Sequence, residues 1–141
     1  MMKYPPVSDP ALVGTFPALA KAGGGFVWDE VLEYRVWCHP ERGAPDDNDG
    51  SDYFCAFPSY DDAETFFRVT EGADKPLALI IQREYISEEE PGRYVHVKED
   101  RIAEWPVEFL SRPRRTQSTI PDFLSPDAPE DRLEILRGLA K

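Results

Sequence analysis

The sequence predicts an α+β fold: an antiparallel sheet of about five strands in the order β-β-α-β-β-β, with one packed helix and a C-terminal tail helix. Three observations predict it. Several segments alternate apolar and polar residues with the period of two that is typical of strands. One segment, residues 59–72, has helical spacing instead. The turns between the last strands are too short for parallel crossovers.

The length of 141 residues is typical of a single domain. We expect an N-terminal arm and glycine-rich turn at 1–26, one α+β domain at 27–110, and a proline-rich tail with a short amphipathic helix at 111–141. In the arm, residues 17–22 could form one or two helical turns. The three glycines at 23–25 are costly to order and favour a turn or a hinge there.

The first two strands are expected at 27–38 and 53–57, joined by an acidic loop at 41–52. Pro40 ends the first strand, since proline cannot continue a ladder. Alternation divides this strand into two faces. The apolar face carries Leu32, Tyr34, Val36 and Cys38, and the other face carries Glu33, Arg35, Trp37 and His39.

The helix follows the second strand. Ser59 is a good N-cap, and two aspartates in the first turn suit the helix dipole. Gly72 is expected to end the helix. The face expected to pack on the sheet consists of Ala63, Phe66, Phe67 and Thr70.

Three more strands are expected, at 77–86, 94–98 and 101–105, with turns at 88–92 and 99–100. The first is the most apolar run and is expected to be central. The last has no predicted neighbour on one side and could pair with its copy in a homodimer.

The tail contains the basic segment 112–115, which we expect to dock on the acidic surface of its own domain. Prolines break the chain after it, and residues 130–141 predict a short helix whose apolar side carries Leu133, Leu136, Leu139 and Ala140. A helix this short is marginal alone, so it must pack on its own domain or on a partner.

Charge and composition exclude several classes of function. The net charge of −11, from 27 acidic and 16 basic residues, disfavours nucleic acid and anionic lipid as partners. An acidic mimic of nucleic acid stays open as an alternative. The chain has neither an apolar run of about 20 residues nor an apolar signal region. Its two cysteines are then expected as thiols, and the location as cytoplasmic.

The motif search predicts no metal and no cofactor. Cys38 and His39 are adjacent on a strand and point to opposite faces, so they do not form a zinc site. Placing Gly50 at the sixth position of a calcium loop puts proline at the first and alanine at the twelfth, so loop 46–52 is solvated or binds calcium weakly. Phosphate-loop and hydrolase-elbow motifs are absent. A nucleophilic pair of Cys38 or Cys55 with His96 is a further alternative to buried core thiols.

The candidate binding patch lies on the last three strands. Exposed aromatic side chains beside arginine and histidine could bind an anion or a peptide, although cross-strand pairing that stabilises the sheet predicts the same pattern. The residues of this patch are Arg83, Tyr85, Tyr94, His96 and Trp105.

Two segments, 34–40 (Tyr-Arg-Val-Trp-Cys-His-Pro) and 91–98 (Pro-Gly-Arg-Tyr-Val-His-Val-Lys), resemble small bacterial proteins that are often labelled GCN5-like acetyltransferases. The resemblance covers roughly residues 31–125 and implies acetyl-CoA as a substrate. In that family a Gln/Arg-x-x-Gly-x-Gly/Ala turn at a helix start binds the pyrophosphate. The nearest segment here, residues 21–25, precedes the expected sheet, so no catalytic or CoA-binding residue carries over.

Two functions follow as expectations. The first is a small, non-catalytic module that binds a protein partner or a small anionic ligand. The second is an acetyltransferase-like enzyme with a degenerate acetyl-CoA site.

Overall fold

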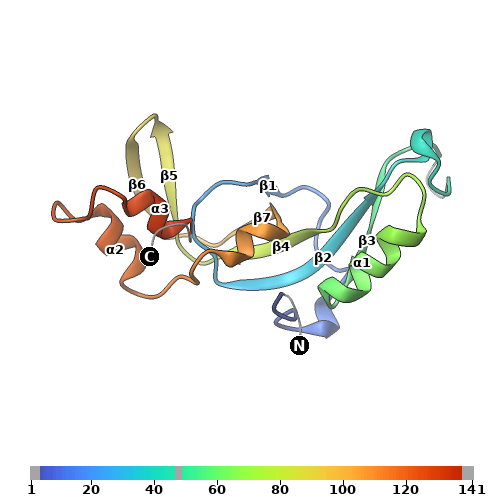
Figure 1. Cartoon of the computed structure of the whole chain (residues 1–141), viewed down its shortest axis with the longest axis horizontal. Coiled ribbons are helices and arrows are strands. Elements are labelled where there is room, and N and C mark those ends of the chain that lie inside the picture. The colour runs from blue at the N-terminus through green and yellow to red at the C-terminus, as the bar shows by residue number, and fades with distance from the viewer. Residues whose placement is uncertain (1–3, 47–48, 138–141) are drawn as a thin grey trace.

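The computed structural model describes residues 4–46 and 49–137, and it confirms the α+β class. A five-stranded sheet has the order β1-β7-β4-β2-β3, and β5 and β6 form a separate two-stranded sheet (Figure 1). The strands are β1 Lys21–Ala22, β2 Glu30–Cys38, β3 Tyr53–Phe57, β4 Leu77–Gln82, β5 Tyr85–Glu90, β6 Arg93–Val97 and β7 Arg101–Pro106. The α-helices are α1 Tyr60–Val69, α2 Thr119–Leu124 and α3 Arg132–Leu136, and the 3-10 helices are η1 Pro10–Leu12, η2 Pro40–Arg42 and η3 Val107–Ser111.

The main sheet is mixed, not purely antiparallel as expected. Residues 21–22, expected at the end of a helical turn, form β1, which pairs in parallel with Ala103 and Glu104 of β7. The N–H of Gly23 extends the pairing by donating to the carbonyl of Glu104 at 3.2 Å. The strand β7 therefore lies inside the sheet, and the free edge expected at 101–105 is covered at these two residues.

The apolar run at 77–86 is two strands and not one. The chain leaves the main sheet after Gln82, where the backbone N–H of Arg83 donates to the carboxylate of Asp29 at 2.8 Å instead of to a neighbouring strand. Residues 88–90 belong to β5, and the turn lies at Pro91–Gly92. The β5–β6 hairpin thus projects from one end of the molecule, away from α1 and β3 (Figure 1).

The helix α1 begins as the sequence predicts. The hydroxyl of Ser59 accepts a hydrogen bond from the N–H of Asp62 at 3.1 Å and caps the helix. The helix ends earlier than expected, at Val69, and Gly72 lies beyond it with a φ of +76°. Its apolar side packs on the sheet through Ala63 and two partly buried phenylalanines, as expected.

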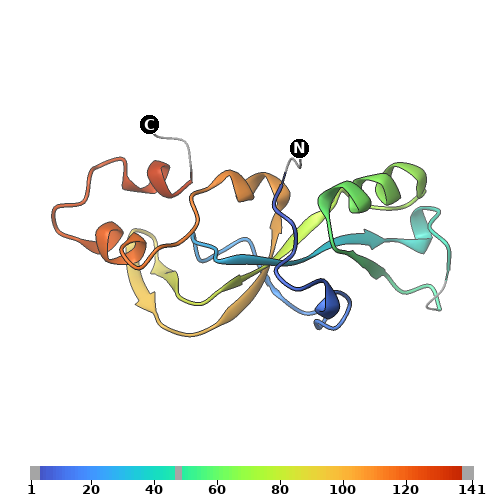
Figure 2. The ribbon, with the colours of Figure 1, turned by 90° about the horizontal axis from the view of Figure 1, so that it is seen from below.

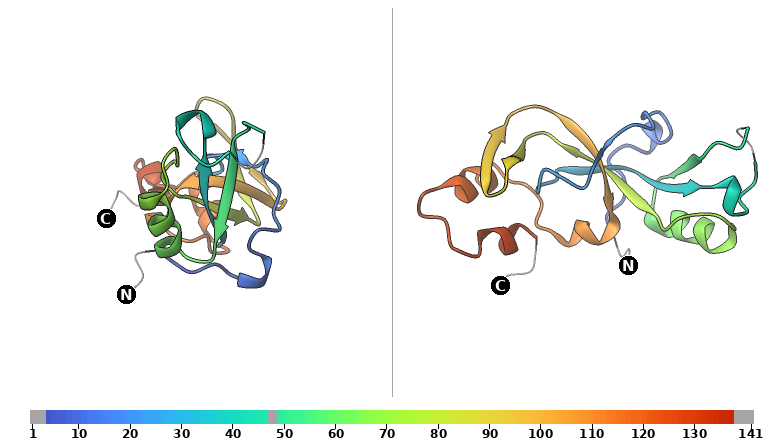
Figure 3. Two further views of the ribbon diagram at one scale, coloured as in Figure 1. Left: turned by 90° about the vertical axis from the view of Figure 1, so that its right-hand side faces the viewer. Right: turned by 90° about the horizontal axis from the view of Figure 1, so that it is seen from above.

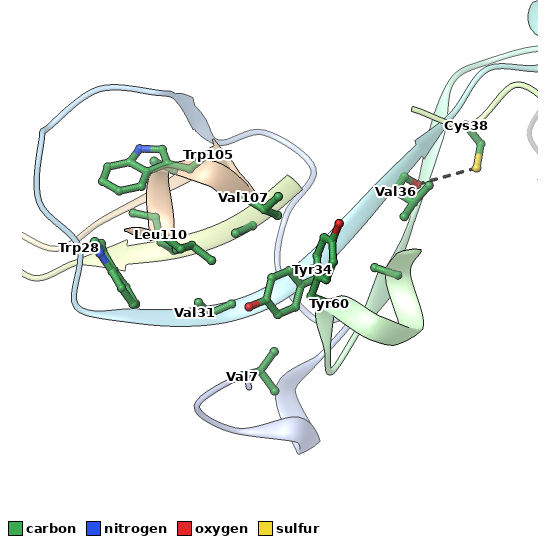
Figure 4. Close-up of a cluster of buried hydrophobic side chains, with 14 of the residues drawn as sticks. Val7, Trp28, Val31, Tyr34, Val36, Cys38, Tyr60, Trp105, Val107 and Leu110 are labelled. Atoms are coloured by element: carbon green, nitrogen blue, oxygen red, sulfur yellow. Dashed lines mark hydrogen bonds between the residues drawn. The ribbon is translucent and has the colours of Figure 1, made fainter. Parts of the chain in front are cut away.

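One face of the sheet carries the main core (Figure 4). A bulge between Val31 and Glu33 shifts the register, so Val31 and not Leu32 joins Tyr34 on this face. The face is covered by α1, by η3 and by the N-terminal residues around Val7. The buried strand residues are Val31, Tyr34, Val36, Cys38, Ala78, Ile80, Ala103 and Trp105.

The other face of the sheet holds a buried ion pair. Arg35 and Glu33 are both fully buried, and Nε of Arg35 donates to Oε2 of Glu33 at 2.6 Å. Arg35 also donates to Oε2 of Glu104 at 3.0 Å. Its remaining N–H groups reach the carbonyls of residues 17 and 18 at 2.6 and 3.3 Å, which fastens the N-terminal segment to this face. Figure 2 shows that segment with η1 on one side of the sheet, and α1 and η3 on the other.

The tail packs on its own chain and forms a second core. Val27 and Ile86 meet Ile120 and Phe123 of α2 and Leu136 of α3, and all five side chains are buried. Figure 3 shows the two tail helices beside the β5–β6 hairpin. The expected helix is shorter than predicted, and Leu139 and Ala140 lie outside the described residues. In the part of the chain that the structure describes, no helix has the length and apolar character needed to cross a membrane.

We predict that Arg35→Met lowers the free energy of unfolding by about 3–5 kcal/mol, because it leaves the Glu33 carboxylate buried without its charge partner. Urea denaturation followed by fluorescence measures the change. The same substitution at Arg93, an exposed residue 4.0 Å from exposed Glu90, should leave the midpoint unchanged. Adding Glu33→Leu to Arg35→Met should restore part of the loss, because it removes the unpaired carboxylate of Glu33 but not the carbonyls of residues 17 and 18 that Arg35 binds. Equal midpoints for Arg35→Met and Arg93→Met would contradict the prediction.

Candidate functional site

Of the five residues of the predicted patch, only Tyr94 and His96 lie on one face, and Trp105, Arg83 and Tyr85 lie elsewhere. Trp105 is fully buried in the main core, where its indole N–H donates to the carbonyl of Gly24 at 3.3 Å. Arg83 is exposed and forms an ion pair with Glu30 at 2.8 Å. The hydrogen bond with Glu30 raises the pKa of Arg83, and the side chain is held at the start of β2.

Tyr94 and His96 share one face of β6, as predicted, but the tail covers that face. The ring of Tyr94 lies 5.0 Å from the ring of Phe123 in α2 and 5.5 Å from the guanidinium of Arg132. Burial raises the pKa of Tyr94, and the neighbouring Glu88 raises it further. These contacts make Tyr94 part of the second core.

His96 belongs to a network of polar side chains that also includes Glu84, Arg115 and Asp29. Its Nε2 lies 2.7 Å from Oε1 of Glu84, and the other oxygen of Glu84 accepts from Arg115 at 2.9 Å. Arg115 also pairs with Asp29 at 2.9 Å. Only 13% of the Arg115 side chain is exposed, and its partner Asp29 is 10% exposed. The network therefore ties the tail to β2 and the hairpin, as the sequence predicts for the basic segment.

Tyr85 points to the opposite face of the hairpin, because it pairs with Val97 whereas Ile86 pairs with His96. There it lines an open groove of about 530 Å³ between the β1 segment and the start of β7. Ligand sites commonly have volumes of about 300–1,000 Å³. The groove is lined by Leu19, Ala20, Lys21, Tyr85, Asp100, Arg101 and Ile102.

Arg101 places a positively charged guanidinium in the lining of the groove. Its guanidinium stacks 5.0 Å from the centre of the Tyr85 ring, and its Nη2 would lie 3.1 Å from a Cβ atom at Gly24. Glycine at that position therefore leaves space for the charged head. Within residues 4–46 and 49–137, Arg101 and Lys21 form no ion pair with a carboxylate, and the buried Nε of Arg101 has no hydrogen-bond partner.

Sequence reasoning found Tyr85 but missed Lys21, Arg101 and Leu19, an apolar side chain that is 90% exposed. The pairing of β1 with β7 brings them together, and a strand of two residues has no periodicity that a sequence could reveal. The one available signal was the position of Arg101 directly after the expected turn at 99–100.

The alternative of a cysteine–histidine pair is not supported. Cys38 ends β2 and Cys55 lies in β3, at the end of the molecule opposite to β6, which carries His96 (Figure 1). Burial raises the pKa of Cys38, and the nearby Cys55 raises it further. Its thiol is therefore held in the protonated, weakly nucleophilic form.

Comparisons with protein-family models, with curated proteins and with solved structures give no match. The acetyltransferase resemblance of segments 34–40 and 91–98 therefore stays a prediction.

We predict that Arg115→Met loosens the tail, because Asp29 and Glu84 lose a half-buried charged partner. Backbone amides of α2 and α3 should exchange with deuterium roughly tenfold faster or more, since hydrogen bonds to charged groups contribute about 1.5–3 kcal/mol. Amides of β2 and β4 should keep their rates. Arg137→Met, at an exposed position in the same tail, is the control. Unchanged exchange in both variants would show that the ion pairs do not hold the tail.

Proposed function

We propose that this chain is a small, non-catalytic module that binds a small anion with an apolar portion in the groove around Arg101. The observation that supports this most directly is the state of the Arg101 guanidinium. In a chain with 27 acidic residues, it faces a groove of ligand size and has no carboxylate partner in the described ranges 4–46 and 49–137.

The lining suits a carboxylate at one end of the ligand. A guanidinium presents five donors in a planar fork and can hold a carboxylate through two parallel hydrogen bonds. Lys21 adds a second positive charge on the β1 side. Because Tyr85 stacks on Arg101, the guanidinium is held in a defined orientation.

The rest of the lining restricts the ligand further. Leu19 and Ile102 offer apolar surface to a hydrocarbon portion. Asp100 is in the same lining and repels negative charge, so a ligand with several negative charges is disfavoured against one with a single charged end. The seven lining residues include no histidine, cysteine or serine, so they form neither a Ser–His nor a Cys–His pair.

Hexanoate is a suitable probe because it combines one carboxylate with a short apolar chain. In an NMR titration we expect shifts at residues 19–24 and 100–102, with a Kd of about 1 mM or lower. Arg101→Met should weaken binding at least about tenfold, because it removes the donor fork and keeps the length of the side chain. Arg93→Met, which changes an exposed arginine of the hairpin, should bind hexanoate like the unmodified protein.

Hexanol and acetyl-CoA complete the experiment. Hexanol has the same chain without the charge and should bind much more weakly. Binding of hexanol as tight as that of hexanoate, or equal affinity in Arg101→Met, would refute the anion site. Acetyl-CoA, which the sequence resemblance implies, carries several phosphates and should not bind detectably at 1 mM; tight binding of acetyl-CoA would favour the acetyltransferase function instead.

A further inference from the structure

A second group of side chains with ligand chemistry lies at the other end of the sheet, far from the groove. The antiparallel register of β2 and β3 places Cys38 opposite Tyr53. The next residues outward, His39 and Asp52, therefore face each other. Each of His39, Glu41 and Asp52 offers one ligand atom, a ring nitrogen or a carboxylate oxygen, and these three atoms all lie within 4.8 Å of one another.

The backbone holds His39 in this position. Its N–H donates to the carbonyl of Gly72 at 2.9 Å, and its carbonyl accepts from the N–H of Ala44 at 3.3 Å. A Cβ atom at Gly72 would lie 2.8 Å from the His39 carbonyl oxygen and 2.5 Å from the Ala44 nitrogen, closer than real contacts allow. The close approach of these segments thus requires glycine and fixes the start of η2.

The two ring nitrogens of His39 have different surroundings. Nε2 contacts Oδ2 of Asp74 at 2.7 Å, and the same carboxylate pairs with Arg42 at 3.3 Å. Nδ1 lies 2.9 Å from Oδ1 of Asp52, but the geometry of this contact does not satisfy a hydrogen bond. Nδ1 is shielded from solvent, and the whole side chain is only 13% exposed.

This is the arrangement that metal-binding histidines use. Such a histidine donates one ring N–H to a carboxylate, which fixes the tautomer and directs the lone pair of the other nitrogen at the metal. Here Asp74 is the carboxylate that would accept from Nε2–H. Nδ1 then keeps its lone pair free, 2.9 Å from Oδ1 of Asp52, and a carboxylate oxygen of Glu41 belongs to the same cluster of ligand atoms.

We propose that His39, Glu41 and Asp52 bind one divalent transition-metal ion, with Nδ1 of His39 as the nitrogen ligand and Asp74 as its orienting carboxylate. One imidazole and two carboxylates suit Zn²⁺ or Mn²⁺ better than Ca²⁺, which prefers six to eight oxygen ligands. The net charge of the site also suits a divalent ion. With His39 neutral, three carboxylates and Arg42 leave two negative charges, which a divalent ion neutralises.

The same contacts have a simpler explanation, and the experiment must separate the two. Contacts with Asp74 and then Asp52 raise the pKa of His39, so an ion-free imidazolium between two aspartates is also stable. Sequence reasoning rejected a zinc site because it compared His39 only with Cys38, and it considered Asp52 only as part of the calcium-like loop 46–52. The carboxylates come from residues 2, 13 and 35 positions further along the chain, and folding brings them together.

Isothermal titration of the full chain with ZnCl₂ tests the site. We expect one ion per chain with a micromolar Kd, and weaker binding of CaCl₂ and MgCl₂. His39→Gln and Glu41→Gln should each weaken Zn²⁺ binding at least about tenfold, and Asp74→Asn about 10–100-fold. His96→Gln removes the other of the two histidines and is the matched control, with unchanged affinity.

Glu41 is exposed, so its variant should keep the unfolding midpoint of the unmodified protein and separates loss of a ligand from loss of fold. A long-range ¹H–¹⁵N spectrum identifies the ligand atom, because Zn²⁺ should shift the Nδ1 resonance of His39 and leave Nε2 protonated. Absence of binding up to 1 mM ZnCl₂ would overturn the proposal. Unchanged affinity in both His39→Gln and Glu41→Gln, as expected if Zn²⁺ binds to the thiols, would do so too.

Discussion

The buried charge of Arg35 is the constraint on which the main sheet depends. A guanidinium with no solvent contact must find a partner for each N–H group, and Arg35 finds Glu33 on its own strand and Glu104 on β7. Its remaining donors reach two backbone carbonyls of the N-terminal segment. A single side chain thus connects β2, β7 and the segment that leads into β1. Residues 19–21, which follow those two carbonyls, line the groove around Arg101. The shape of the groove therefore depends on the buried guanidinium of Arg35.

The parts of the fold that sequence predicted are those set by neighbours along the chain. Alternation over nine residues found β2, and the side chain of Ser59 marked the start of α1. The parts that failed are set by distant partners. The N–H of Arg83 donates to Asp29 and not to a neighbouring strand, and the main sheet ends there. The residue pattern within 77–86 does not predict this contact. The same holds for β1, which exists because Ala103 and Glu104 lie beside it.

The candidate sites follow the same division. Tyr94 and His96 were placed on a shared face by period two, and this was correct, but the alternation of one strand cannot say which distant segment covers that face. Helices α2 and α3 cover it. The residues that line the groove with Tyr85 are brought there by β1, a strand of two residues that sequence alternation cannot detect. By contrast, the closeness of His39 and Asp52 was within reach of sequence reasoning. His39 follows the first expected strand and Asp52 precedes the next, and both strands were expected in one antiparallel sheet.

The second core has a consequence for how the chain can be divided. Val27 and Ile86 belong to the part expected as an independent domain, yet the other buried residues of their cluster are Ile120, Phe123 and Leu136 of the tail. A fragment ending at 110 would expose these side chains and lose Arg115, the charged partner of Asp29 and Glu84. We expect such a fragment to self-associate through the bare hairpin. The tail and the β5–β6 hairpin therefore form one packing unit, and removing either exposes the apolar side chains of the other.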